Sequence, residues 1–242
     1  MAKIVREGVN LVVCDLPYGI TRCEWDRPIN LKRLWEQYER VLAPNGAVLL
    51  FAQSKFMAAL ANSSPHFRYD LVWDKSYCTG FQNARRMPLR RHESILVFYR
   101  SLPAFHPQGL VPLSKDRSPT IKPSEVYGRL RGVAKGKSMT GFPQSILRFP
   151  RDHKAKPCEK PIDLLEYLIR TYSNEGDVVM DNTMGLGGTG LAAVQSGRRF
   201  IGIEIDRERF AIAKARITHL MASGGGCGKR VEGEGRVESL AA

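Results

Sequence analysis

The chain has 242 residues, which is enough for one sizeable hydrophobic core and a small insertion. Its 37 lysines and arginines outnumber its 24 aspartates and glutamates and give a formal net charge of +13, which suits a polyanionic partner such as nucleic acid. Its five cysteines show neither a CxxC pair nor zinc spacing, and no apolar run is long enough for a membrane span or a signal peptide, so we expect a cytoplasmic protein without disulfides.

The predicted elements alternate between strands and helices along most of the chain. Apolar runs bounded by turn residues predict strands at about 9–14, 46–51, 69–73, 94–99, 177–181 and 199–204. Apolar residues at helical spacing predict helices at 31–44, 161–173 and 207–221, with Pro44 ending the first, Pro161 in the first turn of the second and Asp206 capping the third. The alternation predicts an α/β fold, with a doubly wound, mostly parallel sheet covered on both faces.

Two segments depart from this alternation. Residues 101–150 are rich in proline, glycine, serine and basic side chains and show no long periodic run, which predicts an irregular basic insertion. Residues 223–242 are glycine-rich and polar, and we expect a disordered tail there.

A glycine-rich turn joins two predicted strands in the segment DVVMDNTMGLGGTGLAAVQSGRRFIGIEID, residues 177–206. Glycines at such a turn let the backbone approach a ligand, and the helix that starts near Gly188 offers its N–H groups beside it. Asp181 ends the first strand and Glu204 the second, where an acidic side chain can accept hydrogen bonds from both ribose hydroxyls. These features favour a nucleoside cofactor, and a glycine loop of purely structural use is the alternative.

The stretch LVVCDLPYGI, residues 11–20, runs from a buried-looking strand into Asp15, Pro17 and Tyr18. At the carboxyl end of a strand in an open α/β sheet, these residues would face a bound ligand. The carboxylate and a carbonyl exposed by the proline's missing N–H could accept hydrogen bonds from an exocyclic amino group, and the tyrosine could stack on the ring that carries it. The alternative is a turn in which Asp15 caps the backbone and Tyr18 packs.

Together these two motifs resemble the amino-group DNA methyltransferases that use S-adenosylmethionine, whose signature is Asp-Pro-Pro-Tyr or a close variant. The motif order, with Asp-Leu-Pro-Tyr first and the glycine loop last, resembles the permuted β group of that family over about residues 9 to 220. The segment GFQNARRMPLRRHE, after the predicted strand at 69–73, is similar to phage and prophage adenine-specific enzymes. Leu16 replaces the first proline of the signature, and Asn182, Thr183 and Leu186 replace the usual Pro, Phe and Ser of the glycine loop.

The resemblance implies a Rossmann-like methyltransferase domain with a catalytic half at 1–100, a target-recognition insertion at 101–150 and a cofactor-binding half at 151–222. It implies S-adenosylmethionine as the cofactor and makes Asp15, Pro17 and Tyr18 the catalytic residues. The residues that it implies for the cofactor are Lys160, Pro161, Asp181, Asn182, Gly185, Gly187, Thr189 and Glu204. No metal site is expected, because the histidines lack metal-ligand spacing to a cysteine or to one another.

Basic residues in two segments are expected to contact DNA, mostly through its phosphates, with a solvated surface charge as the alternative for each. They are Arg85, Arg86, Lys115, Arg129, Arg131, Lys135 and Lys137. We expect the partner to be double-stranded DNA with a flipped target base, in a bacterial or phage-infected cytoplasm, and we allow for a homodimer.

The expected function is site-specific methylation of the exocyclic N6 of adenine in DNA, because the family more often pairs Asp at the first signature position with adenine and Ser with cytosine. Within the enzyme class, a cytosine-N4 DNA methyltransferase and an RNA methyltransferase are the alternatives. A catalytically impaired DNA-binding relative is another, favoured by the short segment ahead of residue 9. Methylation of a protein amide fits the +13 charge and the basic insertion less well.

Overall fold

The structure, a computed structural model, describes residues 1, 4–21, 23, 26–113, 139–151 and 159–224. The chain divides into two compact units, one formed by Met1–His106 with Ser145–Ala242 and the other by Pro107–Gln144. The described residues of the second unit form one antiparallel pair of short strands, β5 (Val111–Pro112) with β6 (Met139–Thr140). This unit falls inside the segment 101–150 that the sequence predicts to be an insertion.

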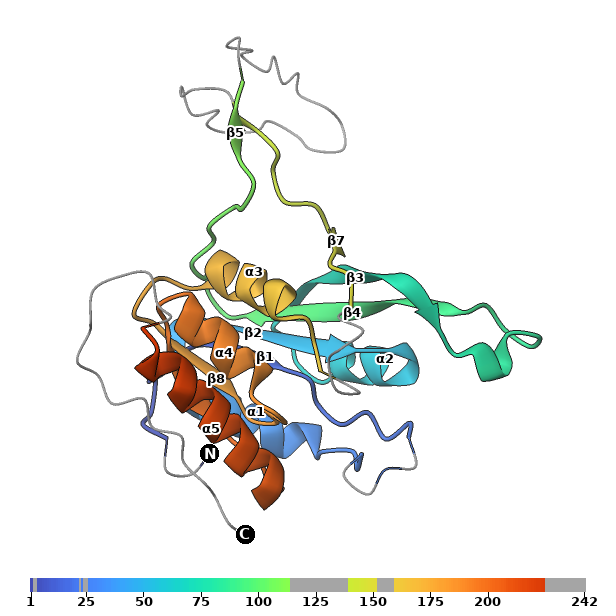
Figure 1. Ribbon diagram of the computed structural model, residues 1–242, viewed down its shortest axis with the longest axis horizontal. Coiled ribbons are helices and arrows are strands. Elements are labelled where there is room, and N and C mark those ends of the chain that lie inside the picture. The colour runs from blue at the N-terminus through green and yellow to red at the C-terminus, as the bar shows by residue number, and fades with distance from the viewer. Residues whose placement is uncertain (2–3, 22, 24–25, 114–138, 152–158, 225–242) are drawn as a thin grey trace. The chain divides into compact units, whose positions relative to one another are not determined.

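The first unit is built on a central sheet (Figure 1). Seven strands of the described chain form it in the order β7–β3–β4–β2–β1–β8–β9. They are β1 (Val9–Cys14), β2 (Leu42–Ala52), β3 (Phe67–Thr79), β4 (Arg90–Tyr99), β7 (Ile146–Arg148), β8 (Val178–Asp181) and β9 (Arg199–Gly202). Neighbouring strands run parallel except in the pairs β2–β4 and β3–β4, so the predicted mostly parallel α/β sheet is confirmed.

Helices cover both faces of the sheet. They are α1 (Leu31–Val41), α2 (Ser54–Asn62), α3 (Ile162–Tyr172), α4 (Gly188–Gln195) and α5 (Arg207–Ala222), with a short 3₁₀ turn, η1 (Phe81–Asn83), between β3 and β4. Alternate residues of β1 point to opposite faces, so Leu11 and Val13 pack in one core with α3, α4 and α5. Val12 and Cys14 pack in the other core with α1 and α2. The strand that ends at the Asp-Leu-Pro-Tyr motif is therefore buried on both sides, which holds its carboxyl end in place.

Some elements differ from the prediction. Helix α1 ends at Val41 rather than at Pro44, because proline disfavours the helical conformation in the residue before it, and the chain passes directly into β2. Helix α2 was not predicted; Gln53 makes no side-chain cap bond that would mark its start. Strand β7 lies in the segment predicted to be irregular, and its three residues, paired with β3, are too few to show a period.

Two predicted helix features are observed directly. The side chain of Asp206 accepts hydrogen bonds from the N–H groups of Glu208 and Arg209 and so caps α5 as expected. The small-residue helix predicted to start near Gly188 is α4. None of the helices in the described residues is long and apolar enough to cross a bilayer.

Candidate active site

The carboxyl ends of three parallel strands bring the predicted site residues to one edge of the sheet. Asp15 follows β1, Asp181 ends β8, and Glu204 lies two residues beyond β9. Strand β8 lies between β1 and β9 and pairs in parallel with both. Because carboxyl ends of parallel strands share an edge, the two motifs separated by more than 150 residues in sequence become neighbours.

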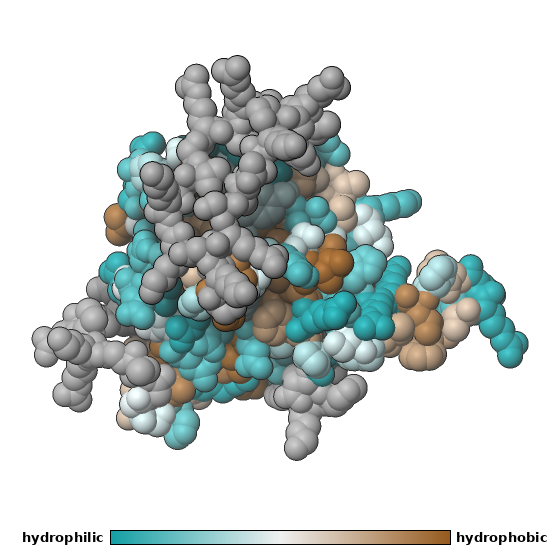
Figure 2. All heavy atoms as spheres, turned by 90° about the horizontal axis from the view of Figure 1, so that it is seen from above, coloured by the Kyte–Doolittle hydropathy of each residue, from teal (hydrophilic) through white to brown (hydrophobic). Residues whose placement is uncertain are grey.

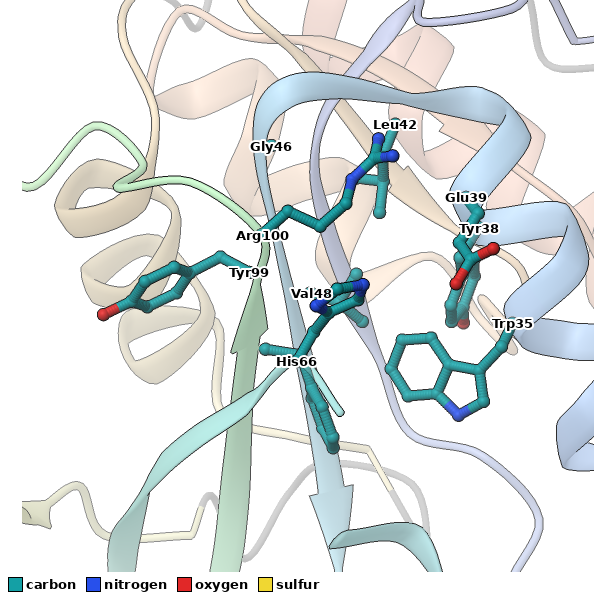
Figure 3. A pocket seen from close by; sticks show the side chains of 10 residues that line it. Trp35, Tyr38, Glu39, Leu42, Gly46, Val48, His66, Tyr99 and Arg100 are labelled. Carbon is teal, nitrogen blue, oxygen red and sulfur yellow. The ribbon is translucent and has the colours of Figure 1, made fainter. Parts of the chain in front are cut away.

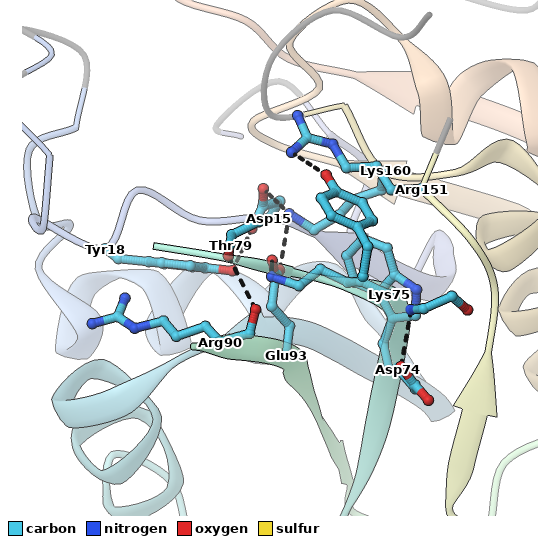
Figure 4. Close-up of polar contacts among 12 residues, drawn as sticks. Asp15, Tyr18, Asp74, Lys75, Thr79, Arg90, Glu93, Arg151 and Lys160 are labelled. Carbon is cyan, nitrogen blue, oxygen red and sulfur yellow. Dashed lines mark hydrogen bonds and ion pairs between the residues drawn. The ribbon is translucent and has the colours of Figure 1, made fainter. Parts of the chain in front are cut away.

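Asp15 is held by contacts with Tyr18, Lys160 and Thr183, and Figure 4 shows the first two. Its Oδ1 accepts a hydrogen bond of 2.6 Å from the Tyr18 hydroxyl, and its Oδ2 is ion-paired with the Lys160 ammonium. Its backbone carbonyl accepts a 3.0 Å hydrogen bond from the Thr183 hydroxyl, which joins the two motifs directly. With 30% of its side chain exposed, this carboxylate is fixed in direction and still accessible from solvent.

Tyr18 is oriented by two contacts. Its ring stacks on Phe56 of α2, with ring centroids 5.1 Å apart and planes 26° apart, and its hydroxyl points to Asp15. Burial raises the pKa of the phenol well above its ordinary value, and the neighbouring Asp15 charge raises it further. Tyr18 is therefore a neutral hydrogen-bond donor to Asp15 at physiological pH.

The turn after Tyr18 is organised by Asp26, which the sequence did not single out. Its buried carboxylate accepts hydrogen bonds from the backbone N–H groups of Gly19, Ile20 and Thr21 at 2.8, 2.9 and 2.6 Å. Burial alone would raise the pKa of Asp26, but hydrogen bonding from the Thr21 side chain and from these backbone groups outweighs it and lowers the pKa. By accepting hydrogen bonds from three successive backbone N–H groups, Asp26 fixes the conformation of the turn after Tyr18.

A row of four alternating charges begins at the partly exposed Asp15 and runs inward. The Lys160 ammonium that pairs with Asp15 also lies 3.4 Å from Oε2 of Glu93, and Oε1 of Glu93 lies 3.3 Å from the Lys75 ammonium. The side chains of Lys75, Glu93 and Lys160 are only 5%, 11% and 11% exposed. Burial opposes each charge, but the opposite charges outweigh it, lowering the pKa of Glu93 and raising that of Lys160.

Sequence reasoning missed Lys75 and Glu93. They come from β3 and β4, where the antiparallel register pairs Trp73 with Glu93. The available signal was a charged residue beside the apolar run in each of DLVWDKS and HESILVFYR. Two charges of opposite sign at the same end of two neighbouring strands favour an ion pair, but only the register shows that they meet.

The glycine loop is fixed by the side chain of Asp181. Its Oδ1 accepts a 3.0 Å hydrogen bond from the Thr183 N–H, and its Oδ2 accepts a 2.7 Å hydrogen bond from the Thr189 hydroxyl. The side chain is buried, and this burial raises the pKa of the carboxyl from 3.8 to about 6. Asp181 and Thr189 were both predicted to bind the cofactor, but in the structure their side chains are hydrogen-bonded to each other within the loop.

Gly187 and Gly185 play different parts in this loop. Gly187 has φ 85° and caps α4, and a Cβ there would lie 3.0 Å from the Cβ of Ala213, so both the backbone conformation and the close packing favour glycine at this position. Gly185 has φ 53°, and a Cβ there would meet nothing within 4 Å. The loop is therefore closely packed against α5 on one side and open at Gly185.

Two other predicted cofactor residues also contact the protein. Oε2 of Glu204 accepts a 2.8 Å hydrogen bond from the Gly185 N–H, and its Oε1 accepts one of 3.0 Å from the Asp206 N–H. A carboxylate offers about four lone-pair sites, so Glu204 keeps acceptor capacity for hydroxyl groups. The side-chain oxygen of Asn182 accepts hydrogen bonds from Tyr38 and Cys14 in the core, so this oxygen points away from the edge.

A sequence profile of the N6/N4 type, described as DNA methylase, matches residues 9–215. The chain belongs to this DNA methylase family. The resemblance seen in the sequence is confirmed, and the methylase is an S-adenosylmethionine-dependent DNA methyltransferase of the kind that modifies exocyclic amino groups. The open loop at Gly185 and the remaining acceptor capacity of Glu204 fit a nucleoside cofactor at this edge.

Named relatives match over most of the methylase. The type II methyltransferase M.HpaI of Haemophilus parainfluenzae is 25% identical over 90% of this chain and 70% of its own length. The DNA adenine methyltransferase YhdJ of Escherichia coli is 25% identical over 90% of this chain and 79% of its own. The M1.HpyAVI–SAM complex is 26% identical with a TM-score of 0.58, covering 86% of this chain and 88% of that one. The cytosine-N4-specific PvuII DNA methyltransferase, at 15% identity and a TM-score of 0.63, covers 99% of this chain and 90% of its own and shares the fold.

The predicted DNA contacts of the methylase lie partly outside the described residues. Arg85 and Arg86 are exposed at the far end of the β3–β4 hairpin, just after η1. Phe81 and Met87 on the same hairpin end are 69% and 48% exposed, and Figure 2 shows hydrophobic and hydrophilic residues side by side on this projection. The other predicted contacts fall on residues that the structure does not describe: Lys115, Arg129, Arg131, Lys135 and Lys137.

A pocket beside α1 is remote from the site. Its lining includes Trp35, Gly46, His66 and Phe98, close to the start of β2 and the end of β4 (Figure 3). Because β2 runs parallel to β1, this is the opposite edge of the sheet from Asp15. The pocket therefore lies outside the candidate site at the carboxyl ends of the strands.

Proposed function

We propose that the methylase transfers a methyl group from S-adenosylmethionine to N6 of adenine in double-stranded DNA. The observation that carries the proposal is an oriented, solvent-accessible Asp15 carboxylate in an Asp-Leu-Pro-Tyr turn beside the glycine loop. Adenine is favoured over cytosine because the signature begins with Asp rather than Ser, as in the adenine-specific enzymes that the sequence resembles. The relative named as a DNA adenine methyltransferase supports the same choice.

Asp15 is the centre of the proposed chemistry. It accepts a hydrogen bond from the target amino group, which directs the nitrogen lone pair and stabilises the positive charge that develops on nitrogen during transfer. The backbone carbonyl of Leu16 or of Pro17 accepts the second amino hydrogen. When the cofactor is bound, its sulfonium supplies a methyl group that is already electrophilic, so the protein mainly provides alignment.

The target base must leave the duplex for its amino group to reach Asp15. Tyr18, with its ring direction set by Phe56 and its hydroxyl by Asp15, contacts the flipped base in this proposal. On the DNA side, Arg85 and Arg86 neutralise phosphates from the exposed hairpin end.

The cofactor residues divide into those that hold it and those that shape its loop. Glu204 accepts hydrogen bonds from the ribose hydroxyls, and Gly185 lets the backbone come close. Asp181, Thr189 and Gly187 keep the loop in its conformation. Lys160 and Pro161 are proposed to border the methionine part of the cofactor, and Asn182, whose side-chain oxygen is bonded in the core, is proposed to help shape the loop.

The direct test is to incubate the purified protein with DNA and labelled S-adenosylmethionine and to digest the product to nucleosides. We expect N6-methyladenine, whereas N4-methylcytosine would show that the base assignment is wrong. Asp15→Asn should lower the rate by about 100-fold or more. Asp163→Asn, the same change at an exposed position in the first turn of α3, is the matched control and should leave the rate unchanged.

A catalytically impaired DNA-binding relative is distinguished by the cofactor. Calorimetric titration of the protein with S-adenosylmethionine should show binding, and Glu204→Gln should weaken it. Binding of DNA without binding of S-adenosylmethionine would contradict the proposed enzyme and favour the impaired relative.

A further inference from the structure

The Lys160 ammonium occupies the position beside Asp15 where the target amino group binds in the proposed reaction. It is ion-paired with Oδ2 of Asp15, while the Tyr18 hydroxyl takes Oδ1. An ammonium beside Asp15 satisfies the carboxylate as the target amino group would. It also places a positive charge next to the nitrogen that becomes positive during methyl transfer. Repulsion between these like charges would raise the energy of the transition state.

Glu93 provides a second position for the same ammonium. Its Oε2 lies 3.4 Å from the nitrogen of Lys160, is buried, and has no hydrogen-bond partner within the structure's described residues. Its Oε1 is paired with Lys75, which keeps the carboxylate in place. A buried acceptor without a hydrogen bond is costly, so a small movement of Lys160 toward Glu93 gains a bond on that side.

The surroundings of Lys160 favour such a movement over departure into solvent. The ammonium lies 4.9 Å from the centre of the Phe51 ring and 6.0 Å from that of Trp73, both buried, which stabilises the positive charge at this depth. Asp15, at 30% side-chain exposure, is the most accessible member of the charge row. A substrate that reaches Asp15 would therefore meet the outer end of the row and displace the lysine inward.

We infer that Glu93 is a positioning residue for methyl transfer and acts through Lys160. In the free enzyme the Lys160 ammonium pairs with Asp15 and takes the place of the target amine. When the amine arrives, Glu93 accepts the ammonium and leaves Oδ2 of Asp15 to the amine. This inference rests on the proposed function, in which Asp15 binds the target amino group.

The first test measures stability and needs no activity. Asp15→Asn alone leaves Lys160 with Glu93, and Glu93→Gln alone leaves it with Asp15. The double variant leaves the buried lysine without an acid, so its thermal midpoint should fall by about 3 °C more than the two single losses combined. Additive losses would show that the two carboxylates do not share Lys160, which overturns the inference.

The second test measures single-turnover methyl transfer with DNA and S-adenosylmethionine both saturating. In Glu93→Gln the lysine stays on Asp15, and the rate should fall by about tenfold. Adding Lys160→Gln to Glu93→Gln removes the competitor, so the double variant should be faster than Glu93→Gln alone. A double variant as slow as Glu93→Gln, or slower, contradicts action through Lys160.

Two further comparisons complete the design. If Glu93→Gln alone does not fold, the rate of Lys160→Gln is compared with that of the double variant Glu93→Gln, Lys160→Gln. The two rates should agree within about threefold, because the amide that replaces the Glu93 carboxylate still offers an oxygen to Lys75. A double variant more than tenfold slower would show that Glu93 acts independently of Lys160. Glu166→Gln, which breaks a half-buried ion pair with Arg170 on α3, is the matched control and should change the rate less than twofold.

The outcomes separate this inference from the function on which it rests. A wild-type protein that methylates no DNA contradicts the proposed function, while the stability test still reports whether Lys160 is shared. An active wild type with additive losses of stability and of rate retains the function and rejects the role of Glu93.

Discussion

Ionisation of the Asp181 carboxyl should lower the free energy of unfolding of the methylase as the pH rises from about 4 to about 6. The side chain is buried and spans the glycine loop, accepting hydrogen bonds from the Thr183 N–H and the Thr189 hydroxyl. Burial raises its pKa more than these two hydrogen bonds lower it, and the balance is a pKa of about 6 against an ordinary value of 3.8.

The sign of the effect follows from proton binding. The folded protein holds the Asp181 proton more tightly than the unfolded chain, so the contribution to stability is full below pH 3.8 and is lost as the pH rises through about 6. A shift of about two pKa units corresponds to about 3 kcal/mol in total. Of this, about 2 kcal/mol falls between pH 4 and pH 7, because the unfolded chain is already half ionised near pH 4.

Asp181→Asn removes the titration and isolates it. Asparagine keeps one oxygen acceptor and loses the other, which costs about 1 kcal/mol at every pH and leaves the slope unaffected. The free energy of unfolding, measured in urea at several pH values, should therefore fall by about 2 kcal/mol more in wild type than in the variant between pH 4 and pH 7. All other titrating groups are common to both proteins and cancel. If the difference in free energy of unfolding between the two proteins stays constant within about 0.5 kcal/mol from pH 4 to pH 7, the inference that burial raises the pKa of Asp181 is wrong.

Three smaller predictions test the loop, the turn and the hairpin. Gly187→Ala should destabilise the protein by about 2 kcal/mol in urea unfolding, and more than Gly185→Ala, because only the first position is crowded. Asp26→Asn should loosen residues 19–21, so that their amide hydrogens exchange faster and methyl transfer slows by about tenfold. Replacing Arg85 and Arg86 by Ala should weaken DNA binding and flatten the plot of log affinity against log salt by about 0.9 per lost phosphate contact, and an unchanged slope would exclude them from the interface.

Much of the fold could be predicted because its signals are local. The strand at 9–14 is an apolar run closed by Asp15 and Pro17, and β1 has the same bounds. Asp206 precedes an apolar helical pattern, and it caps α5. The antiparallel placement of β4 between β2 and β3 could not be predicted in this way, because strand order depends on which apolar faces meet across the whole sheet.

The sequence predicts where the residues of the candidate site lie in the sheet, but not which side chains contact one another there. The sequence places Asp15, Asp181 and Glu204 at strand ends, which is enough to bring them to one edge of a parallel sheet. It does not show that the Asp181 carboxylate binds its own loop or that Lys160 is ion-paired with Asp15. Hydrogen-bond directions depend on rotamers and on neighbours distant in sequence, and neither leaves a local pattern.

The contacts between the two motifs explain how the site tolerates a permuted order. Asp15 is held by Thr183 and Lys160, and Cys14 bonds to Asn182, all between segments that are 145 to 168 residues apart in the chain. The bonds of Thr183 and Asn182 depend on β1 and β8 being adjacent and parallel, and that of Lys160 depends on the packing of α3 beside β1, not on which segment comes first in the chain. Joining the chain ends elsewhere would leave the strand neighbours, and hence the bonds, unchanged. The geometry of the candidate site therefore depends on the order of the strands in the sheet, which is why the Asp-Leu-Pro-Tyr motif can precede the glycine loop without loss of the arrangement.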